Sequence, residues 1–199
     1  MINIETIDKK CAKIYNFSSL KTKCSIKWSN KMNLNYYIDY IIKKHRGQTR
    51  KHGIPYYIHP LTVRNILERK GFSIEYQIAG LFHDLIEDTD TTYEDIQKIS
   101  NTRIADVVKL VSKEKGYEMA EYIKRIKEND MARMVKLADR YHNLLETHLA
   151  SEKFQERYIK DTETWYLDLA KDTVFEEDIK SELAKLKNLK KQNEKELIF

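Results

Sequence analysis

One stretch in the middle of the chain, residues 78–89, constrains the fold more than any other. Wound as a helix at about 100° per residue, it gathers its large apolar side chains on one side, as does a helix that packs against a core. These side chains are Ile78, Leu81, Phe82, Leu85 and Ile86. The opposite side carries His83, Asp84 and Glu87. An imidazole and two carboxylates on a core-facing helix predict a metal or catalytic site.

Gly80 lies one turn below that polar group, next to Ala79. Small side chains there leave room for something to approach the helix closely. Glycine weakens a helix by roughly 1 kcal/mol relative to alanine. Its presence inside a helix therefore indicates a packing or a functional need.

Most of the remaining chain shows helical periodicity too, and residues that break helices are rare. The 199 residues include five glycines and two prolines, and strand-like alternation is hard to find. This length suits one domain with an appendage. We predict an all-α protein: a single helical bundle at 31–173, an N-terminal extension at 1–30 and a charged C-terminal helix at 174–199.

Local signals predict some helix positions in more detail. His59 is expected at a junction between a loop and a helix, because the proline that follows it suits a first helical turn. Thr91 with Glu94 matches a capping box for a helix over 93–99. The stretch 154–170 is expected to be helical too.

The chain is mildly basic, with 36 lysines and arginines against 31 acidic residues and a net charge of +5. The two signs are interspersed, which falls short of the basic stripe of a nucleic-acid-binding protein. We expect no nucleic-acid partner and interpret the lysines of the C-terminal helix as a solvated face. The alternative, duplex binding through those lysines, predicts steep salt dependence.

Nothing in the sequence indicates a membrane or an oxidising compartment. No stretch approaches about 18 apolar residues, and the start of the chain has no apolar run typical of a signal peptide. Cys11 and Cys24 match neither a disulfide framework nor a usual zinc spacing, so we interpret them as reduced thiols. We therefore expect a cytoplasmic protein with no membrane partner. A homo-oligomer is compatible with the sequence.

Two imidazoles and two carboxylates from three parts of the chain could meet at one divalent ion, which accepts both ligand types. They are His59, His83, Asp84 and Asp139. Such an ion would keep positions for a water and a substrate oxygen, the layout for metal-assisted hydrolysis of a phosphoryl group. Glu87 and Asp88 lie about one turn beyond His83, where either can orient the water or take its proton.

An anionic substrate would need cations near these carboxylates. The candidates are Arg50, Lys51, Arg157 and Lys160. Arginine can hold phosphate through two hydrogen bonds or stack on a base, whereas lysine acts as a point charge. Asn143 follows Asp139 by four residues, so the two side chains share a helix face.

Four segments, in this order, resemble the HD hydrolase domain of the RelA/SpoT alarmone enzymes. They are HRGQTRK at 45–51, PYYIHP at 55–60, LFHDLIEDT at 81–89 and VKLADRYHNL at 135–144. Residues 161–170 also resemble the family's later helix, so the likeness covers roughly residues 34–171. Linked motifs at compatible spacing are far more specific than a lone His-Asp pair.

The resemblance implies an HD hydrolase domain that holds one Mn²⁺ and removes pyrophosphate from the 3′ position of ppGpp or pppGpp, leaving GDP or GTP. By position, it implies metal ligands at His59, His83, Asp84 and Asp139, and a catalytic acidic pair at Glu87 and Asp88. It implies nucleotide contacts at Arg50, Lys51 and Asn143, and basic positions near the phosphates at Arg157 and Lys160. Because there is no room for a synthetase domain after residue 171, the chain resembles a small stand-alone hydrolase.

Departures from the family pattern bear on the choice of substrate and leave the metal site untouched. His52 stands where a small residue is usual, and Tyr141 replaces an aliphatic one. Residues 112–129 match poorly, and Lys113 or Lys115 there is a candidate phosphate contact. The alternative is the same chemistry on an adenosine alarmone, a deoxynucleotide or NADPH. A non-catalytic nucleotide sensor or antitoxin is a further alternative, which the complete set of ligands and acids disfavours.

Overall fold

The computed structural model describes residues 34–50 and 53–196. Within these residues the secondary structure is helical, apart from one isolated antiparallel bridge between Thr49 and Pro55. The predicted all-α fold is confirmed. The predicted N-terminal extension with both cysteines lies outside the described residues, and so do Lys51 and His52.

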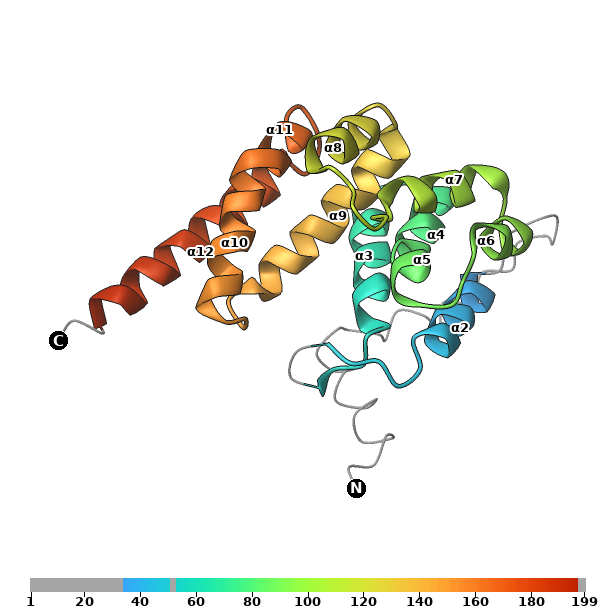
Figure 1. Ribbon diagram of the computed structural model, residues 1–199, viewed down its shortest axis with the longest axis horizontal. Coiled ribbons are helices and arrows are strands. Elements are labelled where there is room, and N and C mark those ends of the chain that lie inside the picture. Colours follow the sequence, from blue (N-terminus) through green and yellow to red (C-terminus); the bar gives the residue numbers. More distant parts are fainter. Residues whose placement is uncertain (1–33, 51–52, 197–199) are drawn as a thin grey trace, which may run out of the picture. The chain divides into compact units, whose positions relative to one another are not determined.

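Apart from residues 45–57 between the first two, the helices are joined by short connections, and most of them pack against α9. In chain order they are α2 (Leu34–Lys44), α3 (Ile58–Arg69), α4 (Ile74–Phe82), α5 (Leu85–Asp88), α6 (Tyr93–Ile99), α7 (Thr102–Val111), α8 (Met119–Lys127), α9 (Asp130–Thr147), α10 (Glu152–Asp161), the π-helical segment η3 (Thr162–Tyr166), α11 (Leu167–Ala170) and α12 (Glu176–Glu196). α3 and α4 pack against one side of α9, and α10 and α12 against the other (Figure 1).

Apolar side chains of α3, α4, α7 and α9 form the core beneath the site. Ile78, Leu81 and Phe82 of α4 are fully buried, as their spacing predicts. Val135 and Ala138 of α9 are also fully buried. The polar residues next to Val135 and Ala138 therefore project from α9, whose position is fixed by the packing of these apolar side chains.

Gly80 allows α3 and α4 to approach each other closely. A Cβ atom at Gly80 would lie 2.6 Å from Leu67 Cδ1 and 3.4 Å from Val63 Cγ1, both on α3. The first distance is shorter than real side chains tolerate. The glycine thus serves packing, one of the two needs predicted for it, and α3 fills the room beside it.

The prediction of one continuous helix across residues 78–89 is wrong, because the helix is interrupted at His83 and Asp84. α4 and α5 are separate helices, and Asp84 between them has φ −99° and ψ −2°. The Gly80 carbonyl accepts a hydrogen bond from His83 Nδ1 at 2.7 Å, so the imidazole itself caps the end of α4. The interruption lets two adjacent side chains turn toward the same point.

α6 has its predicted bounds, but its cap lies one residue later than predicted. Thr92 Oγ1 accepts a hydrogen bond from the Asp95 N–H at 3.2 Å, and the Thr92 N–H donates to Asp95 Oδ2 at 3.1 Å. Thr91 is buried instead. The sequence offers both registers, Thr91 with Glu94 and Thr92 with Asp95, so spacing alone could not choose between them.

The helical stretch predicted over 154–170 is present, but it is not regular. It runs from α10 through the π-helical segment Thr162–Tyr166 into α11. A π-helical turn inserts a residue into the α-helical repeat and is often found at functional sites. It changes which side chains share a face before and after it.

α12 packs against α9, α10 and α11 along a thin apolar seam. Ile179, Leu183 and Leu186 are buried there, whereas Leu189, further along the helix, is 46% exposed. Lys187 and Lys190 of α12 form ion pairs with Glu163 and Glu156. Among the described helices, none combines the length and the apolar character that a membrane crossing requires.

Replacing Gly80 with alanine should destabilise the protein. Overpacking a core costs about 1–3 kcal/mol, which exceeds the roughly 1 kcal/mol that alanine gains over glycine in a helix. Urea unfolding should therefore show a lower midpoint for Gly80→Ala. Adding Leu67→Ala, which removes the clashing methyl groups, should cost less than the two single changes together. A Gly80→Ala protein as stable as the original would contradict this account of the packing.

Candidate functional site

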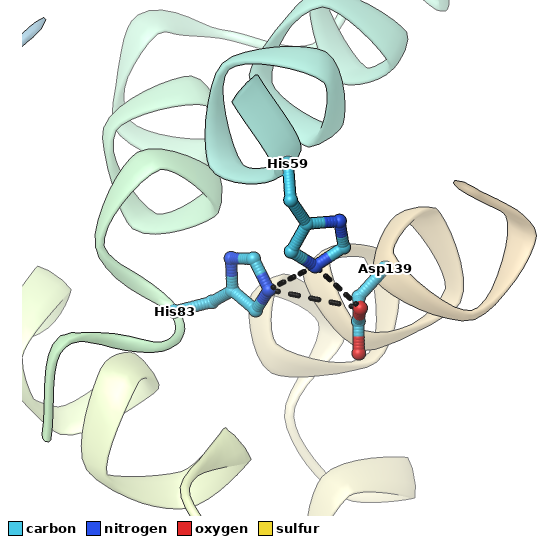
Figure 2. Close-up of side chains that lie close together, drawn as sticks. All are labelled: His59, His83 and Asp139. Atoms are coloured by element: carbon cyan, nitrogen blue, oxygen red, sulfur yellow. Dashed lines mark hydrogen bonds and ion pairs between the residues drawn. The ribbon is translucent and has the colours of Figure 1, made fainter. Parts of the chain in front are cut away.

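Two imidazoles and one carboxylate from three separate helical regions meet at one point. His59 Nε2 lies 3.2 Å from His83 Nε2 and 3.1 Å from Asp139 Oδ1, and His83 Nε2 lies 3.7 Å from the same oxygen (Figure 2). The three atoms thus lie within 4.8 Å of one another, a spacing that could hold a metal ion. His59 and His83 are each 2% exposed and Asp139 is 7% exposed. The point is therefore shielded from bulk solvent.

Asp84 adds a second carboxylate to this group. Its Oδ2 lies 3.1 Å from His83 Nε2 and 3.5 Å from His59 Nε2. The Tyr56 hydroxyl lies 2.9 Å from Asp84 Oδ2 and 2.6 Å from Asp88 Oδ2. All four residues predicted as metal ligands are thus brought together, with a tyrosine between one of them and a predicted catalytic acid.

Hydrogen bonds at the far side of each imidazole set the direction of its free nitrogen. His83 Nδ1 donates to the Gly80 carbonyl, so Nε2 is the nitrogen that faces the centre. His59 Nδ1 lies 2.6 Å from His142 Nδ1, and His142 Nε2 lies 3.4 Å from Glu146 Oε1. With Glu146 accepting from His142, the consistent assignment has His59 donating through Nδ1 and its Nε2 facing the centre. Such partners orient metal-binding histidines.

The charges at this point are strongly coupled. Burial lowers the pKa of His59 to about 4, so this ring is neutral at pH 7. Burial acts the same way on His83, but the carboxylates of Asp84 and Asp139 outweigh it and raise its pKa to about 10. Burial would raise the pKa of Asp139, yet Lys136 and the two imidazoles hold it well below its usual range. A divalent ion would take the place of the positive charge that His83 carries.

A cavity of about 200 Å³ opens beside these residues, and its lining is almost entirely polar. The carboxylates that line it are Asp84, Glu87, Asp88 and Asp139, and the cations are Arg50, Lys113, Lys136 and Arg140. Four negative charges face four positive ones, so the lining is formally neutral. A divalent ion would give it a charge of +2, which suits an anionic ligand.

The predicted catalytic acids both line this cavity, but their surroundings differ. Glu87 accepts a hydrogen bond from the backbone N–H of Lys113, and burial raises its pKa despite the opposing effect of Lys136. Asp88 contacts the Tyr56 hydroxyl at 2.6 Å. Its raised pKa makes Glu87 a candidate proton acceptor at this cavity.

Arg50 and Asn143 connect this cavity to a second pocket. Arg50 Nη2 donates to Asn143 Oδ1 at 2.8 Å and pairs with Glu146 Oε2 at 2.8 Å. Both line the second pocket, of about 230 Å³, together with Ile54, Glu146, Thr147, Leu149 and Phe154. This pocket is mainly apolar, in contrast to the polar cavity beside it.

The structure does not bring the other predicted substrate contacts to this cavity. Arg157 is exposed, and its guanidinium lies 5.2 Å from the centre of the Phe154 ring. Lys160 is exposed and lines a separate groove with residues of α12, including Lys187. Lys51 lies outside the described residues. The cations that reach the cavity from α9 are Lys136 and Arg140 instead.

Sequence reasoning missed Lys136 and Arg140 although their spacing carried a signal. Together with Asp139 and Asn143 they occupy positions i, i+3, i+4 and i+7 of α9, which form one face of a helix. All four line the cavity. His142, which was not among the predicted site residues, is buried and lies behind His59. No spacing rule indicated that role.

Asp139 closes a ring of hydrogen bonds and ion pairs around the centre. Asn143 Nδ2 donates to Asp139 Oδ1 and, through its own oxygen, accepts from Arg50. Arg50 pairs with Glu146, which contacts His142, which contacts His59. His59 and Asp139 are thus supported from behind by a chain of contacts that includes Arg50, Asn143 and Glu146, which also line the apolar pocket.

The fold is all-α, and its adjacent His-Asp pair meets a second histidine and a distant aspartate. These features define a class of helical proteins with a mixed histidine and aspartate centre. The chain belongs to the HD domain family, whose model matches residues 38–173.

Two relatives carry the name guanosine-3′,5′-bis(diphosphate) 3′-pyrophosphohydrolase. That of Aquifex aeolicus is 36% identical over 136 residues, which cover 64% of this chain and 20% of the relative. That of Danio rerio is 34% identical over 116 residues, which cover 54% of this chain and 64% of the relative. The chain thus spans less than two thirds of either. A solved structure described as a metazoan ortholog of SpoT that hydrolyzes ppGpp shares the fold, with a TM-score of 0.68 and 23% identity over 80% of this chain and 98% of that one.

Replacing His142 with phenylalanine should weaken the binding of a divalent ion without removing any candidate ligand. Loss of a hydrogen-bond partner behind a metal-binding histidine typically costs about 10–100-fold in metal affinity. Titration with Mn²⁺ against a chelator of known affinity measures the change. The exposed His148 offers a matched control, since His148→Phe makes the same chemical change away from the centre. Equal Mn²⁺ affinity in both variants would show that His142 does not support the site.

Proposed function

We propose that the chain hydrolyses the 3′-pyrophosphate of ppGpp or pppGpp and yields GDP or GTP and pyrophosphate. One observation carries this proposal: the four predicted metal ligands converge beside two acids at a cavity lined by four cations. A divalent metal site, a base and an anion-binding surface are the parts that phosphoryl hydrolysis requires. Membership of the HD domain family and the names of the two relatives support the choice of substrate.

His59, His83, Asp84 and Asp139 are the residues that would hold the ion, which we propose to be Mn²⁺. The donor set fits: two imidazole Nε2 atoms that face the centre, His83 giving up its proton when an ion binds, and two carboxylates suit a borderline divalent metal. When bound, such an ion acidifies water and polarises a phosphoryl oxygen. It would also offset two of the four negative charges that line the cavity.

Glu87 is the residue that we propose to take the proton from the attacking water. It lines the cavity, and burial raises its pKa, which makes it a better base than an ordinary glutamate. The water oxygen forms a bond to the phosphorus attached to the 3′ oxygen, and the bond between that phosphorus and the 3′ oxygen breaks. The pyrophosphate keeps the water oxygen, and the 3′ oxygen leaves as a hydroxyl after taking up a proton, which Glu87 can return. Asp88, held by Tyr56, orients the water.

The apolar pocket beside Arg50 and Asn143 is where we propose that the nucleoside binds. It adjoins the polar cavity through these two residues, so a nucleotide could place its base in one and its 3′-pyrophosphate in the other. An arginine can stack on a base, and an asparagine side chain both donates and accepts hydrogen bonds. Lys51 stays a prediction as a further contact, and Arg157 and Lys160 lack support from this geometry. We further propose a cytoplasmic location, because the proposed substrate is an intracellular nucleotide.

Purified protein supplied with Mn²⁺ should release GDP and pyrophosphate from ppGpp, and a chelator should stop the reaction. Asp139→Asn should lower the rate by about 10³-fold or more, since a catalytic metal supplies several kcal/mol of transition-state stabilisation. Asp130→Asn, on the same helix but exposed, is the matched control. Product analysis by anion-exchange chromatography measures both variants.

The same assay on a panel of nucleotides separates the alternatives. Faster turnover of an adenosine alarmone, a deoxynucleotide or NADPH than of ppGpp would move the proposal to that substrate. Tight nucleotide binding without turnover of any member, with Mn²⁺ present, would favour a sensor or an antitoxin and would refute the enzymatic proposal.

Glu87→Gln should lower kcat by about 10²–10⁴-fold, the usual contribution of a general base. The base must be deprotonated, so the rate of the original protein should fall as the pH drops through a pKa that lies above the ordinary value for glutamate. That acid limb should vanish in Glu87→Gln, and Glu94→Gln, an exposed glutamate on α6, should keep it. An unchanged acid limb in Glu87→Gln would assign the base to another residue.

A further inference from the structure

Arg140 is a buried cation without a carboxylate partner. It is 5% exposed, and within the described residues it forms no ion pair. Its Nη1 donates to Thr162 Oγ1 at 3.3 Å. Its guanidinium carbon lies 3.9 Å from the centre of the Tyr158 ring and 3.6 Å from the centre of the Tyr166 ring. Two aromatic rings thus hold the guanidinium by cation–π contacts.

The π-helical segment makes this arrangement of rings possible. Tyr158 and Tyr166 are eight residues apart, which in a regular α-helix separates two side chains by about 80° around the axis. One residue inserted by the π-helical turn reduces the effective separation to seven α-helical positions, or about 20°. Both rings therefore face α9 and meet the same guanidinium.

Aromatic contacts leave unused much of the hydrogen-bonding capacity of the guanidinium. A guanidinium has five N–H groups in its plane, arranged as a rigid fork that matches phosphate oxygens. Arg140 lines the polar cavity, and the residue before it is the candidate metal ligand Asp139. A buried charge is costly unless it is paired, and rings alone compensate it only in part. An anion bound in the cavity would supply the negative charge that Arg140 lacks.

Asp139 does not supply that negative charge, because both of its oxygens have other partners. Its Oδ2 pairs with Lys136 Nζ at 3.0 Å, and its Oδ1 accepts from Asn143 and faces the two imidazoles. Lys136 is thus paired with the candidate metal ligand Asp139. The Arg140 guanidinium is held instead by two tyrosine rings and a threonine hydroxyl. Of the two buried cations of α9, Arg140 is the one available to a ligand.

We propose that Arg140 binds the pyrophosphate group of the substrate, and that Tyr158 and Tyr166 hold its guanidinium plane in position for this contact. This inference rests on the proposed function for the identity of the substrate. The ligand chemistry that it names, a diphosphate anion, can be tested without any nucleotide.

Inorganic pyrophosphate is the probe, titrated calorimetrically into protein with the same excess of free Mn²⁺ in the cell and the syringe. Arg140→Lys keeps the charge and removes the planar fork, and it should raise the Kd for pyrophosphate about tenfold or more, as expected for the loss of charge-assisted hydrogen bonds. The Mn²⁺ affinity should stay unchanged. Arg133→Lys is the matched control, because Arg133 lies on the same helix and donates to the backbone carbonyls of Leu169 and Lys171.

A second variant keeps the test decisive if Arg140→Lys fails to fold. Tyr158→Leu leaves Arg140 in place and removes one of its two rings, and it should raise the Kd for pyrophosphate severalfold. Wild-type affinity in a folded Arg140→Lys protein, or in Tyr158→Leu where the first variant is unfolded, would overturn the proposal. Failure of the original protein to bind pyrophosphate would overturn it too, even if ppGpp is hydrolysed. Arginine-dependent pyrophosphate binding without hydrolysis of any nucleotide would support it and refute the proposed function.

Discussion

The convergence of two buried imidazoles on one aspartate is the contact on which the rest of the site depends. His59, His83 and Asp139 come from α3, the turn after α4, and α9, so their meeting requires these elements to pack in one way. The close approach of α3 and α4 at Gly80 and the burial of the apolar side of α9 provide that packing. The backbone carbonyl of Gly80 then orients His83. One glycine therefore serves both the packing of the helices and the direction of a candidate ligand.

Much of this could be predicted from the sequence because it depends on local periodicity. The apolar spacing of Ile78, Leu81 and Phe82 indicated their burial, and linked motifs indicated that His59 and Asp139 would join the His-Asp pair. The break between α4 and α5 could not be predicted, since it depends on a side chain capping its own helix and on Tyr56 reaching Asp84 from another segment. The buried cations of α9 were missed as well, although their spacing with Asp139 and Asn143 places all four on one face of the helix.

Lys136 and Arg140 show why charge in a sequence is hard to interpret. Both stand on a helix among residues that look like a solvated face, yet both are buried. Their burial is tolerated for different reasons: Lys136 pairs with Asp139, and Arg140 lies between two tyrosine rings. The second arrangement requires a π-helical turn twenty or so residues further along the chain, which no motif for α9 could reveal.

The ring of contacts around the candidate centre has a thermodynamic consequence. Arg50 is shared between Glu146 and Asn143, and these two lead by separate routes to His59 and Asp139. A ligand that draws Arg50 away from either partner alters the support behind two of the candidate metal ligands. Linkage is reciprocal, so the occupancy of the ion must change the affinity for that ligand by the same factor. For the proposed nucleotide substrate, the availability of the ion in the cell would then help to set how much of it the protein binds.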